Sequence, residues 1–308
     1  MLTLAVLGTV WWLGKRAGTE ERESVARQTL RFTPAEVTRL ELVSAKGACV
    51  FDKDTRGAWQ IQSPVKYPAN NAALAELLSQ LSFAECKAVL PAERLGDLDQ
   101  FGLKTPETLA RLRLASGAEC ELALGRETAV AGDMYARVTR DGVTQYLVVA
   151  QGTTLAALLQ KDLARWRSGV VFDFTADQVR GLMLHQESKD VAISKDGAAW
   201  QITKPLTALA DSDAPRVFLA QLLALRATQF VTDNPAEYAN YNLNSPYLVL
   251  TVNLDGGRTV TLRVGRVDAG EESQYYAQQT ALPAVFVITK ETVDFLANLL
   301  DEVRGTIQ

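Results

Sequence analysis

The second half of this chain repeats the first half, motif by motif, at a nearly constant spacing. Four motifs recur in the same order: F-T-x-x-x-V-x-x-L-x-L at residues 32–42 and 174–184, A-W-Q-I-x-x-P at 58–64 and 199–205, an aromatic-G/N-L-x-x-P turn at 101–106 and 241–246, and L-x-L/V-G-R at 122–126 and 262–266. Each copy extends over nearly half of the chain, whereas solenoid repeats are only about 20–50 residues long. A repeat of this length therefore predicts two copies of a whole domain.

Each copy shows the pattern of an α+β domain. Alternation of apolar and polar residues indicates half-buried strands, and in the first copy it occurs at residues 37–43, 109–114, 120–124 and 134–138. Leucines at helical spacing between Leu74 and Leu81 predict a helix that Asn70 or Asn71 can cap, and the second copy predicts helices near 215–225 and 291–303. Strands joined by short turns are mostly antiparallel. We therefore expect two tandem homologous domains, residues 32–168 and 169–308, each with a mostly antiparallel sheet and helices packed on one face.

The bulk composition limits the classes of partner. A chain of 308 residues has room for two cores that need no disulfide or metal. Its formal net charge is −4, with 32 basic against 36 acidic residues. Nucleic-acid binding requires a basic face. We therefore expect no nucleic-acid partner.

The amino terminus predicts a membrane anchor. Residues 2–14 are uncharged and mostly apolar and include Trp11 and Trp12, a pair suited to a membrane interface. The run is shorter than the roughly 20 residues of a spanning helix, so a truncated start stays open, as does the alternative of an ordinary buried helix or strand. Lys15 and Arg16 alone favour a cytoplasmic carboxyl side, although two charges are a weak signal. We interpret residues 1–14 as the anchor and residues 15–31 as a tether.

Three cysteines leave two interpretations open. Cys49, Cys86 and Cys120 all lie in the first copy, and the second copy has none, so the fold does not require a disulfide. They are either small apolar residues of the core, or Cys49 and Cys120 pair in an oxidising compartment and leave Cys86 free.

Residues that could carry catalysis are scarce. The single histidine, His185, has no neighbouring histidine or cysteine with metal-ligand spacing. No nucleophile elbow, H-E-x-x-H, Walker or dinucleotide motif occurs, and Gly125-Arg126 and Gly265-Arg266 lack the further glycines that cradle phosphate. We expect those glycines to end a strand at a turn. We predict no catalytic residue, no cofactor and no metal.

Trp59 and Trp200 are the candidate contact residues, because they recur at the same position of each copy. An exposed tryptophan can stack on a sugar or a peptide. The favoured interpretation is that each anchors the core between sheet and helix, since Ile61 and Ile202 share their strand parity.

The four motifs together resemble the DUF4340 family, and the resemblance extends over residues 32–300. It rests on W-x-I-x-x-P after the opening strands, the F-G-L-x-x-P turn, the L-x-L-G segment and the late hairpin that contains tyrosine. Asn242 replaces Gly102 in the second copy, a mild departure because asparagine also adopts left-handed turns. The resemblance implies an amino-terminal membrane segment, tandem domains and an association with ABC-type transport systems of the gliding-motility kind. It implies no catalytic residues.

Two functional hypotheses follow. The first is a non-enzymatic accessory protein of the bacterial inner membrane, with one anchor and two extracytoplasmic modules that bind protein partners of an ABC-type transport system. The alternative is an envelope module that binds a glycan or a small molecule in a cleft between the halves through Trp59 or Trp200. We expect the contact surfaces where the copies differ most, near residues 82–100 and 226–240 and at the tips of the late hairpins.

Overall fold

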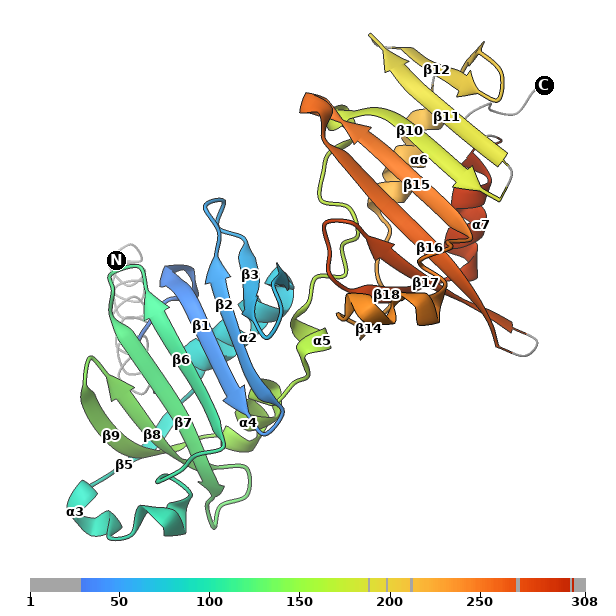
Figure 1. Ribbon diagram of the computed structural model, residues 1–308. Helices are drawn as coiled ribbons and strands as arrows, with labels where there is room; N and C mark the ends of the chain where they lie inside the picture. The colour runs from blue at the N-terminus through green and yellow to red at the C-terminus, as the bar shows by residue number, and fades with distance from the viewer. Residues whose placement is uncertain are drawn as a thin grey trace, which may run out of the picture. The chain divides into compact units, whose positions relative to one another are not determined.

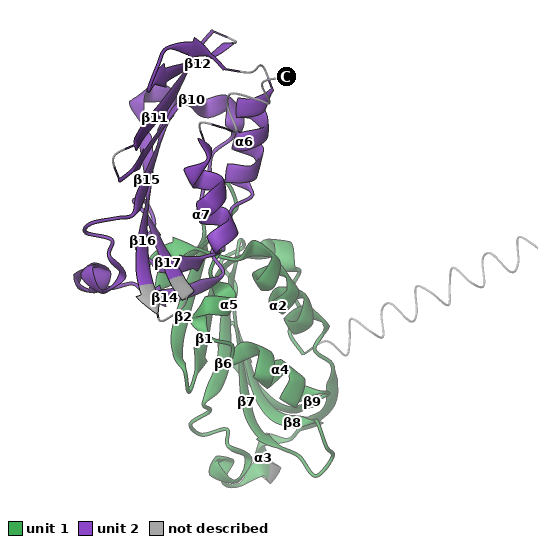
Figure 2. Cartoon of the chain, turned by 90° about the vertical axis from the view of Figure 1, so that its right-hand side faces the viewer, with its two compact units in different colours: residues 1–168 green, residues 169–308 purple. Residues whose placement is uncertain are grey.

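The computed structural model describes residues 29–187, 189–197, 199–210, 213–269, 272–299 and 301. The predicted anchor, 1–14, and all but the last residues of the predicted tether, 15–31, lie outside this part of the chain. The described chain divides between Ser168 and Gly169 into two compact units (Figure 2). Among the described residues, no helix combines the length and the apolar character that crossing a membrane would take.

The first unit contains one antiparallel sheet of nine strands in the order β4-β3-β2-β1-β6-β7-β8-β9-β5 (Figure 1). Its strands are β1 (Val37–Ser44), β2 (Gly47–Lys53), β3 (Trp59–Ser63), β4 (Tyr67–Pro68), β5 (Cys86–Leu90), β6 (Thr108–Leu114), β7 (Glu119–Glu127), β8 (Met134–Arg140) and β9 (Val143–Val149). Its described helices are α2 (Asn71–Phe83), α3 (Ala92–Leu95), α4 (Gly152–Leu159) and α5 (Leu163–Trp166), with 3-10 turns η1 (Pro34–Glu36) and η2 (Leu98–Phe101).

The second unit repeats this topology, with strand order β13-β12-β11-β10-β15-β16-β17-β18-β14. Its strands are β10 (Val179–Gln186), β11 (Lys189–Asp196), β12 (Ala199–Lys204), β13 (Ala208–Leu209), β14 (Gln229–Thr232), β15 (Leu248–Leu254), β16 (Thr259–Ala269), β17 (Glu272–Gln279) and β18 (Val285–Ile288). Its described helices are α6 (Ala214–Leu223) and α7 (Lys290–Ala297), with 3-10 turns η3 (Ala176–Gln178), η4 (Pro235–Tyr241) and η5 (Asp255–Gly257). The predicted fold, two tandem homologous α+β domains, is confirmed.

Helices cover one face of each sheet (Figure 2). Helix α2 begins where the sequence predicts, because the Asn70 side-chain oxygen accepts a hydrogen bond from the Ala73 N–H at 3.1 Å. The apolar side of α2 is buried against the sheet, and its members are Leu74, Leu77, Leu78 and Leu81. Burial of each leucine contributes about 1.5–3 kcal/mol, which makes this contact a main part of the first core.

The strands of the first sheet have one apolar and one polar face. Leu40 of β1 pairs with Phe51 of β2 and with Leu112 of β6, and all three side chains are buried. The neighbouring residues Arg39 and Glu41 point to the opposite face, since successive side chains of a strand alternate. That second face of the sheet carries the charged residues described below.

Two strands were not predicted from the sequence, and one expectation about local structure is wrong. The variable stretches near residues 82–100 and 226–240 contain the edge strands β5 and β14, which pair with β9 and β18. Each edge strand has one neighbour. Because β5 is largely exposed, its sequence lacks a clear alternation of apolar and polar residues. Gly125 and Gly265 do not end strands at turns but lie inside β7 and β16.

The three cysteines are free thiols. Cys49 lies on β2 and Cys120 on β7, and two other strands, β1 and β6, stand between these. Three strand spacings of about 4.8 Å separate the two residues by roughly 14 Å, whereas a disulfide needs Cα atoms within about 7 Å. The alternative of a Cys49–Cys120 disulfide is therefore wrong for this fold. Burial raises the pKa of the Cys120 thiol, as expected for a thiol that serves as a small core residue.

Candidate functional site

The open face of the first sheet carries a set of ion pairs that extends across its middle strands. This charged ladder consists of Arg39, Glu41, Asp52, Arg111, Arg113, Glu119, Glu121 and Arg137. Its members come from β1, β2, β6, β7 and β8. A shallow groove of about 660 Å³ lies over the ladder and is lined mainly by its arginines and glutamates.

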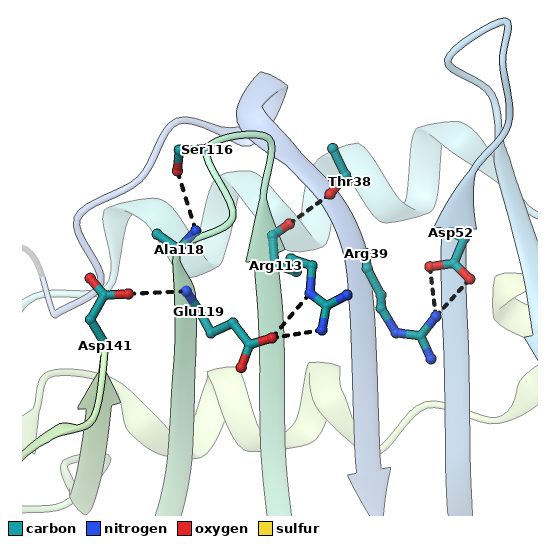
Figure 3. Close-up of polar contacts among 8 residues, drawn as sticks. All are labelled: Thr38, Arg39, Asp52, Arg113, Ser116, Ala118, Glu119 and Asp141. Atoms are coloured by element: carbon teal, nitrogen blue, oxygen red, sulfur yellow. Dashed lines mark hydrogen bonds and ion pairs between the residues drawn. The ribbon is translucent and has the colours of Figure 1, made fainter.

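Two ion pairs of the ladder each contain two hydrogen bonds (Figure 3). The Arg39 Nη1 donates to both Asp52 carboxylate oxygens, at 2.9 and 2.8 Å. Arg113 donates from Nε and Nη2 to Glu119 Oε1, at 3.0 and 2.7 Å. Charge-assisted hydrogen bonds of this kind fix the direction of the guanidinium group as well as its position. These arginines are thus presented in a defined orientation.

Glu121 connects two arginines of the ladder. Its Oε2 accepts a hydrogen bond from Arg111 Nε at 2.8 Å, and its Oε1 accepts one from Arg137 Nη2 at 3.1 Å. Arg111 also donates from Nη1 to Glu41 Oε1 at 3.1 Å. Burial acts to raise the pKa of Glu121, but the hydrogen bonds and charges of Arg111 and Arg137 outweigh it and hold that pKa below its ordinary value. Glu121 is therefore an ionised anchor at neutral pH.

Hydrogen bonds hold the turns and strands beside the ladder (Figure 3). The Asp141 carboxylate accepts from the Glu119 backbone N–H at 3.2 Å, and the Ser116 hydroxyl accepts from the Ala118 N–H at 3.4 Å. The Thr38 hydroxyl donates to the Arg113 carbonyl at 3.2 Å. These hydrogen bonds fix the backbone at Ala118 and Glu119, beside the turn, and at Arg113 in β6.

The second unit has no such ladder at the equivalent described positions. In the first unit β1 and β6 pair Arg39 with Arg113 and Glu41 with Arg111, and the same register in β10 and β15 places uncharged residues there. The equivalent residues are Gly181, Met183, Ser194, Thr251, Asn253, Thr259, Thr261 and Gln278. The ladder is therefore a property of one copy and not of the fold.

The comparisons with known proteins place the chain in a family. The model of the family described as "Domain of unknown function (DUF4340)" matches residues 59–199 and again residues 200–307. The chain belongs to the DUF4340 family. No curated protein matches it. The two DUF4340 matches begin at the equivalent residues Trp59 and Trp200, whereas the compact units divide between Ser168 and Gly169.

The recurring glycine of the DUF4340 repeat has a steric role. A Cβ on Gly125 would lie 2.2 Å from the Phe101 carbonyl oxygen, and one on Gly265 would lie 1.8 Å from that of Tyr241. The F-G-L-x-x-P turn therefore rests directly on the strand that carries L-x-L-G. Asn242 adopts the left-handed conformation of Gly102, with φ of 55° against 68°, and donates from Nδ2 to the Arg266 carbonyl at 2.7 Å. Two of the four motifs are thus the two sides of one contact.

The two predicted contact residues differ in exposure. Trp59 is 5% exposed and belongs to the first core, as the favoured interpretation expects. Trp200 is half-buried, packs against the second core and has the Lys195 ammonium 5.9 Å from its ring centre. Neither residue belongs to the charged ladder: Trp59 lies on β3 of the first unit, and Trp200 lies on β12 of the second unit.

The remaining titratable candidates are exposed or structural. His185 Nδ1 lies 2.7 Å from an Asp190 carboxylate oxygen, and Lys204 lies 3.3 Å from the other oxygen, all three side chains being about half exposed. Among the described residues, no group of three histidine, cysteine or acidic side chains is arranged to hold a metal ion. Asp133 is nearly fully buried and accepts hydrogen bonds from Lys87 at 2.7 and 3.0 Å.

The charged ladder was not predicted from the sequence. Its signal is present in the sequence as charges spaced two residues apart, R-x-E at residues 39–41, R-x-R at 111–113 and E-x-E at 119–121. Alignment of these segments with residues 181–183, 251–253 and 259–261 shows that the charges are confined to the first copy. A residue-by-residue comparison of the two copies on the polar strand positions would have found it.

Proposed function

We propose that this DUF4340 protein is a membrane-anchored, non-enzymatic accessory component of an ABC-type transport system of the bacterial envelope, and that the charged ladder contacts its protein partner. The observation that carries the proposal is the restriction of the ladder to one copy. Both copies keep the residues that build the fold, whereas the open sheet face of the first unit carries charged residues that the second lacks. Such a difference supports a role in recognition.

The chemistry of the ladder suits binding better than catalysis. A general base at neutral pH needs a pKa near 7, whereas the pKa of Glu121 is lowered from that of an ordinary glutamate and its carboxylate is engaged by two arginines. Arginine is enriched in protein–protein interfaces, and patterned charges there set specificity and association rate. A fixed arrangement of positive and negative side chains favours a partner whose own charges have the complementary arrangement.

The test is affinity purification of the tagged full chain from native membranes. We expect recovery of a transporter or envelope component with the wild-type chain. The double variant Arg113→Glu with Glu119→Arg keeps an internal ion pair but inverts the charges presented to a partner. Like-charge contacts cost several kcal/mol, and about 1.4 kcal/mol is tenfold in affinity, so recovery falls by about tenfold or more.

The matched control exchanges a pair on another surface. Lys290 and Asp294 form an exposed ion pair at 2.5 Å on α7, so Lys290→Asp with Asp294→Lys repeats the manipulation away from the ladder. This control retains full recovery. Absence of any such component with the wild-type chain refutes the function, whereas equal recovery with both double variants refutes only the assignment to the ladder.

The proposed location is the extracytoplasmic side of the inner membrane, with residues 1–14 as the anchor. Protease added to spheroplasts then digests the two units, while a cytoplasmic control protein survives. Protection of the units until the membrane is lysed would reverse the proposed topology.

A second candidate function, binding of a glycan or small molecule, is favoured by one observation. Trp200 is half-buried and lies beside Lys195, and a tryptophan that is not fully buried can stack on a sugar. A glycan array probed with the full chain and with Trp200→Ala tests it. Signal that is lost in the variant supports the candidate, and signal that is the same in both chains, or absent from the array, refutes it.

A further inference from the structure

Helices α2 and α4 are neighbours on the helical face of the first sheet, and a cleft of about 500 Å³ lies between them (Figure 2). Its apolar lining includes Ala84, Leu155, Ala157 and Leu158, and its polar lining includes Gln80 and Lys161. Pockets that hold a ligand group are commonly about 300–1,000 Å³ and combine apolar walls with a few polar groups. The cleft has this size and this mixture of side chains.

An exposed aromatic side chain borders the cleft. Phe83, the last residue of α2, lines the cleft and is 73% exposed. It makes no ring contact with another aromatic side chain of the described residues. A single exposed phenylalanine is ordinary, but one that borders an apolar cleft enlarges it into a continuous apolar surface, and such surfaces mark sites of interaction.

The second unit places an aromatic side chain of its own between the corresponding helices. Phe295 of α7 stacks on Phe218 of α6, with ring centres 4.6 Å apart and ring planes 25° apart. Phe218 is fully buried, and Phe295 is partly buried against the same core. An aromatic ring therefore fits between the two helices of this fold.

The caps of α4 and α7 show which residue of the first unit stands in the place of Phe295. Both helices have 8 residues, and Phe295 follows the cap Thr289 at the same separation as Ala157 follows the cap Gln151. Ala157 is exposed and lines the cleft. The first unit thus has a methyl group where the second has a phenyl ring.

The opposite exchange occurs on the other helix. The buried positions of α2 and α6 have the same spacing, Leu74, Leu77, Leu78 and Leu81 against Pro215, Phe218, Leu219 and Leu222. The same offset places Phe83 where the second unit has Ala224, which is exposed. The first unit therefore lacks the ring that stacks between the helices and carries an exposed ring beside the cleft instead.

We propose that the cleft between α2 and α4 binds an aromatic side chain of a protein partner. The ring enters beside Ala157, in the place that Phe295 holds in the second unit, and packs against Phe83. Gln80 and Lys161 can donate hydrogen bonds to carbonyl groups of the partner segment that carries the ring. The inference goes beyond the contact proposed above and does not depend on it, because the charged ladder lies on the opposite face of the same sheet.

Photo-crosslinking of the tagged full chain in native membranes tests the proposal. The photoreactive residue p-benzoyl-phenylalanine replaces Phe83, and the peptides joined to it are sequenced. We expect an adduct with a partner protein in which the joined residue is a phenylalanine, tyrosine or tryptophan or is next to one. Absence of an adduct, or a joined segment without an aromatic residue at that place, overturns the proposal. An adduct with another part of the same chain also overturns it.

A variant that fills the cleft provides the second arm. Ala157→Phe supplies the ring from the chain itself, as α7 does, and lowers the yield of this adduct by about tenfold, which corresponds to about 1.4 kcal/mol of binding. The matched control Ala157→Ser keeps a small side chain at the same exposed position and retains the full yield. Equal yields with the two variants overturn the proposal.

Two controls separate occlusion of the cleft from unfolding. Ala157 is exposed, so the added ring displaces no buried side chain, and we expect Ala157→Phe to melt no lower than Ala157→Ser. The photoreactive residue at Leu206, which is 71% exposed in the second unit, reports on a surface away from the cleft, and Ala157→Phe leaves its adducts unchanged. If Ala157→Phe melts lower, the identity of the residue joined at position 83 decides the proposal, because that measurement does not use the variant.

Discussion

The contact between the F-G-L-x-x-P turn and the L-x-L-G strand can be tested by adding a single methyl group. Gly125→Ala and Gly265→Ala introduce a Cβ at 2.2 Å from the Phe101 carbonyl oxygen and at 1.8 Å from the Tyr241 carbonyl oxygen. Side-chain carbons are not found closer than 3.0 Å to such atoms, so the turn must withdraw in both units, and further in the second. The neighbouring backbone cannot yield as a flexible side chain would.

The size of the expected loss in stability follows from the groups that the added methyl displaces. Overpacking of a well-packed site costs about 1–3 kcal/mol, and the turn carries Leu103, which is fully buried. We expect a loss of about 2 kcal/mol in the free energy of unfolding for Gly125→Ala, in the middle of that range. The loss is larger for Gly265→Ala because the required displacement is larger.

Urea denaturation followed by tryptophan fluorescence measures these losses, with the two units analysed as separate transitions if they unfold separately. Gly169→Ala is the matched control, since its nearest atom would be 3.4 Å from the added Cβ, an ordinary contact. If Gly125→Ala and Gly265→Ala change stability no more than Gly169→Ala does, the turn does not press on the strand and the steric account of the motif is refuted.

Three further predictions concern the first unit. Gly102→Asn is nearly neutral in urea denaturation, because Asn242 adopts the same left-handed turn, whereas Gly102→Ala costs about 1–2 kcal/mol. Glu121→Gln lowers the melting temperature at pH 7, and the difference from wild type shrinks below pH 4.5. The reason is that the pKa of Glu121 is lowered in the folded state. The stabilisation by its carboxylate is therefore present above that pH and is lost as the pH falls through the folded-state pKa. Asp133→Asn weakens the hydrogen bonds from Lys87 and accelerates hydrogen exchange in residues 128–134; unchanged exchange there contradicts this role.

Much of the fold could be predicted from the sequence, because its signals are local. The alternation in β1 and β6 reflects one buried and one open face, and Asn70 caps α2 through an atom three residues away. The edge strands β5 and β14 escaped prediction since each has a single neighbour and little burial to impose a pattern. Gly125 was misassigned for a different reason: its constraint comes from Phe101, which is distant in sequence.

The candidate site was harder to predict for a related reason. A charge at a polar strand position looks like an ordinary solvated residue until its cross-strand partner is known. Arg111 and Glu121 are close in sequence, but Arg111 and Glu41 are far apart, and only the β1–β6 register brings them within 3.1 Å. Trp59 drew attention because it recurs, yet recurrence here marks a core position.

The recurring and the differing residues therefore carry different information in a duplicated chain. The recurring Gly125 and Gly265 keep a turn against a strand in both copies, so they specify the fold whatever each copy does. A residue that differs at an equivalent buried position must be compensated by its neighbours, but one that differs on an open face is free to change. Arg113 against Asn253 is of that second kind. Because the fold does not require the charge, the charge-inverted variants can test a binding role for Arg113, whose Nη2 donates to Glu119 Oε1 at 2.7 Å, without a change in the core.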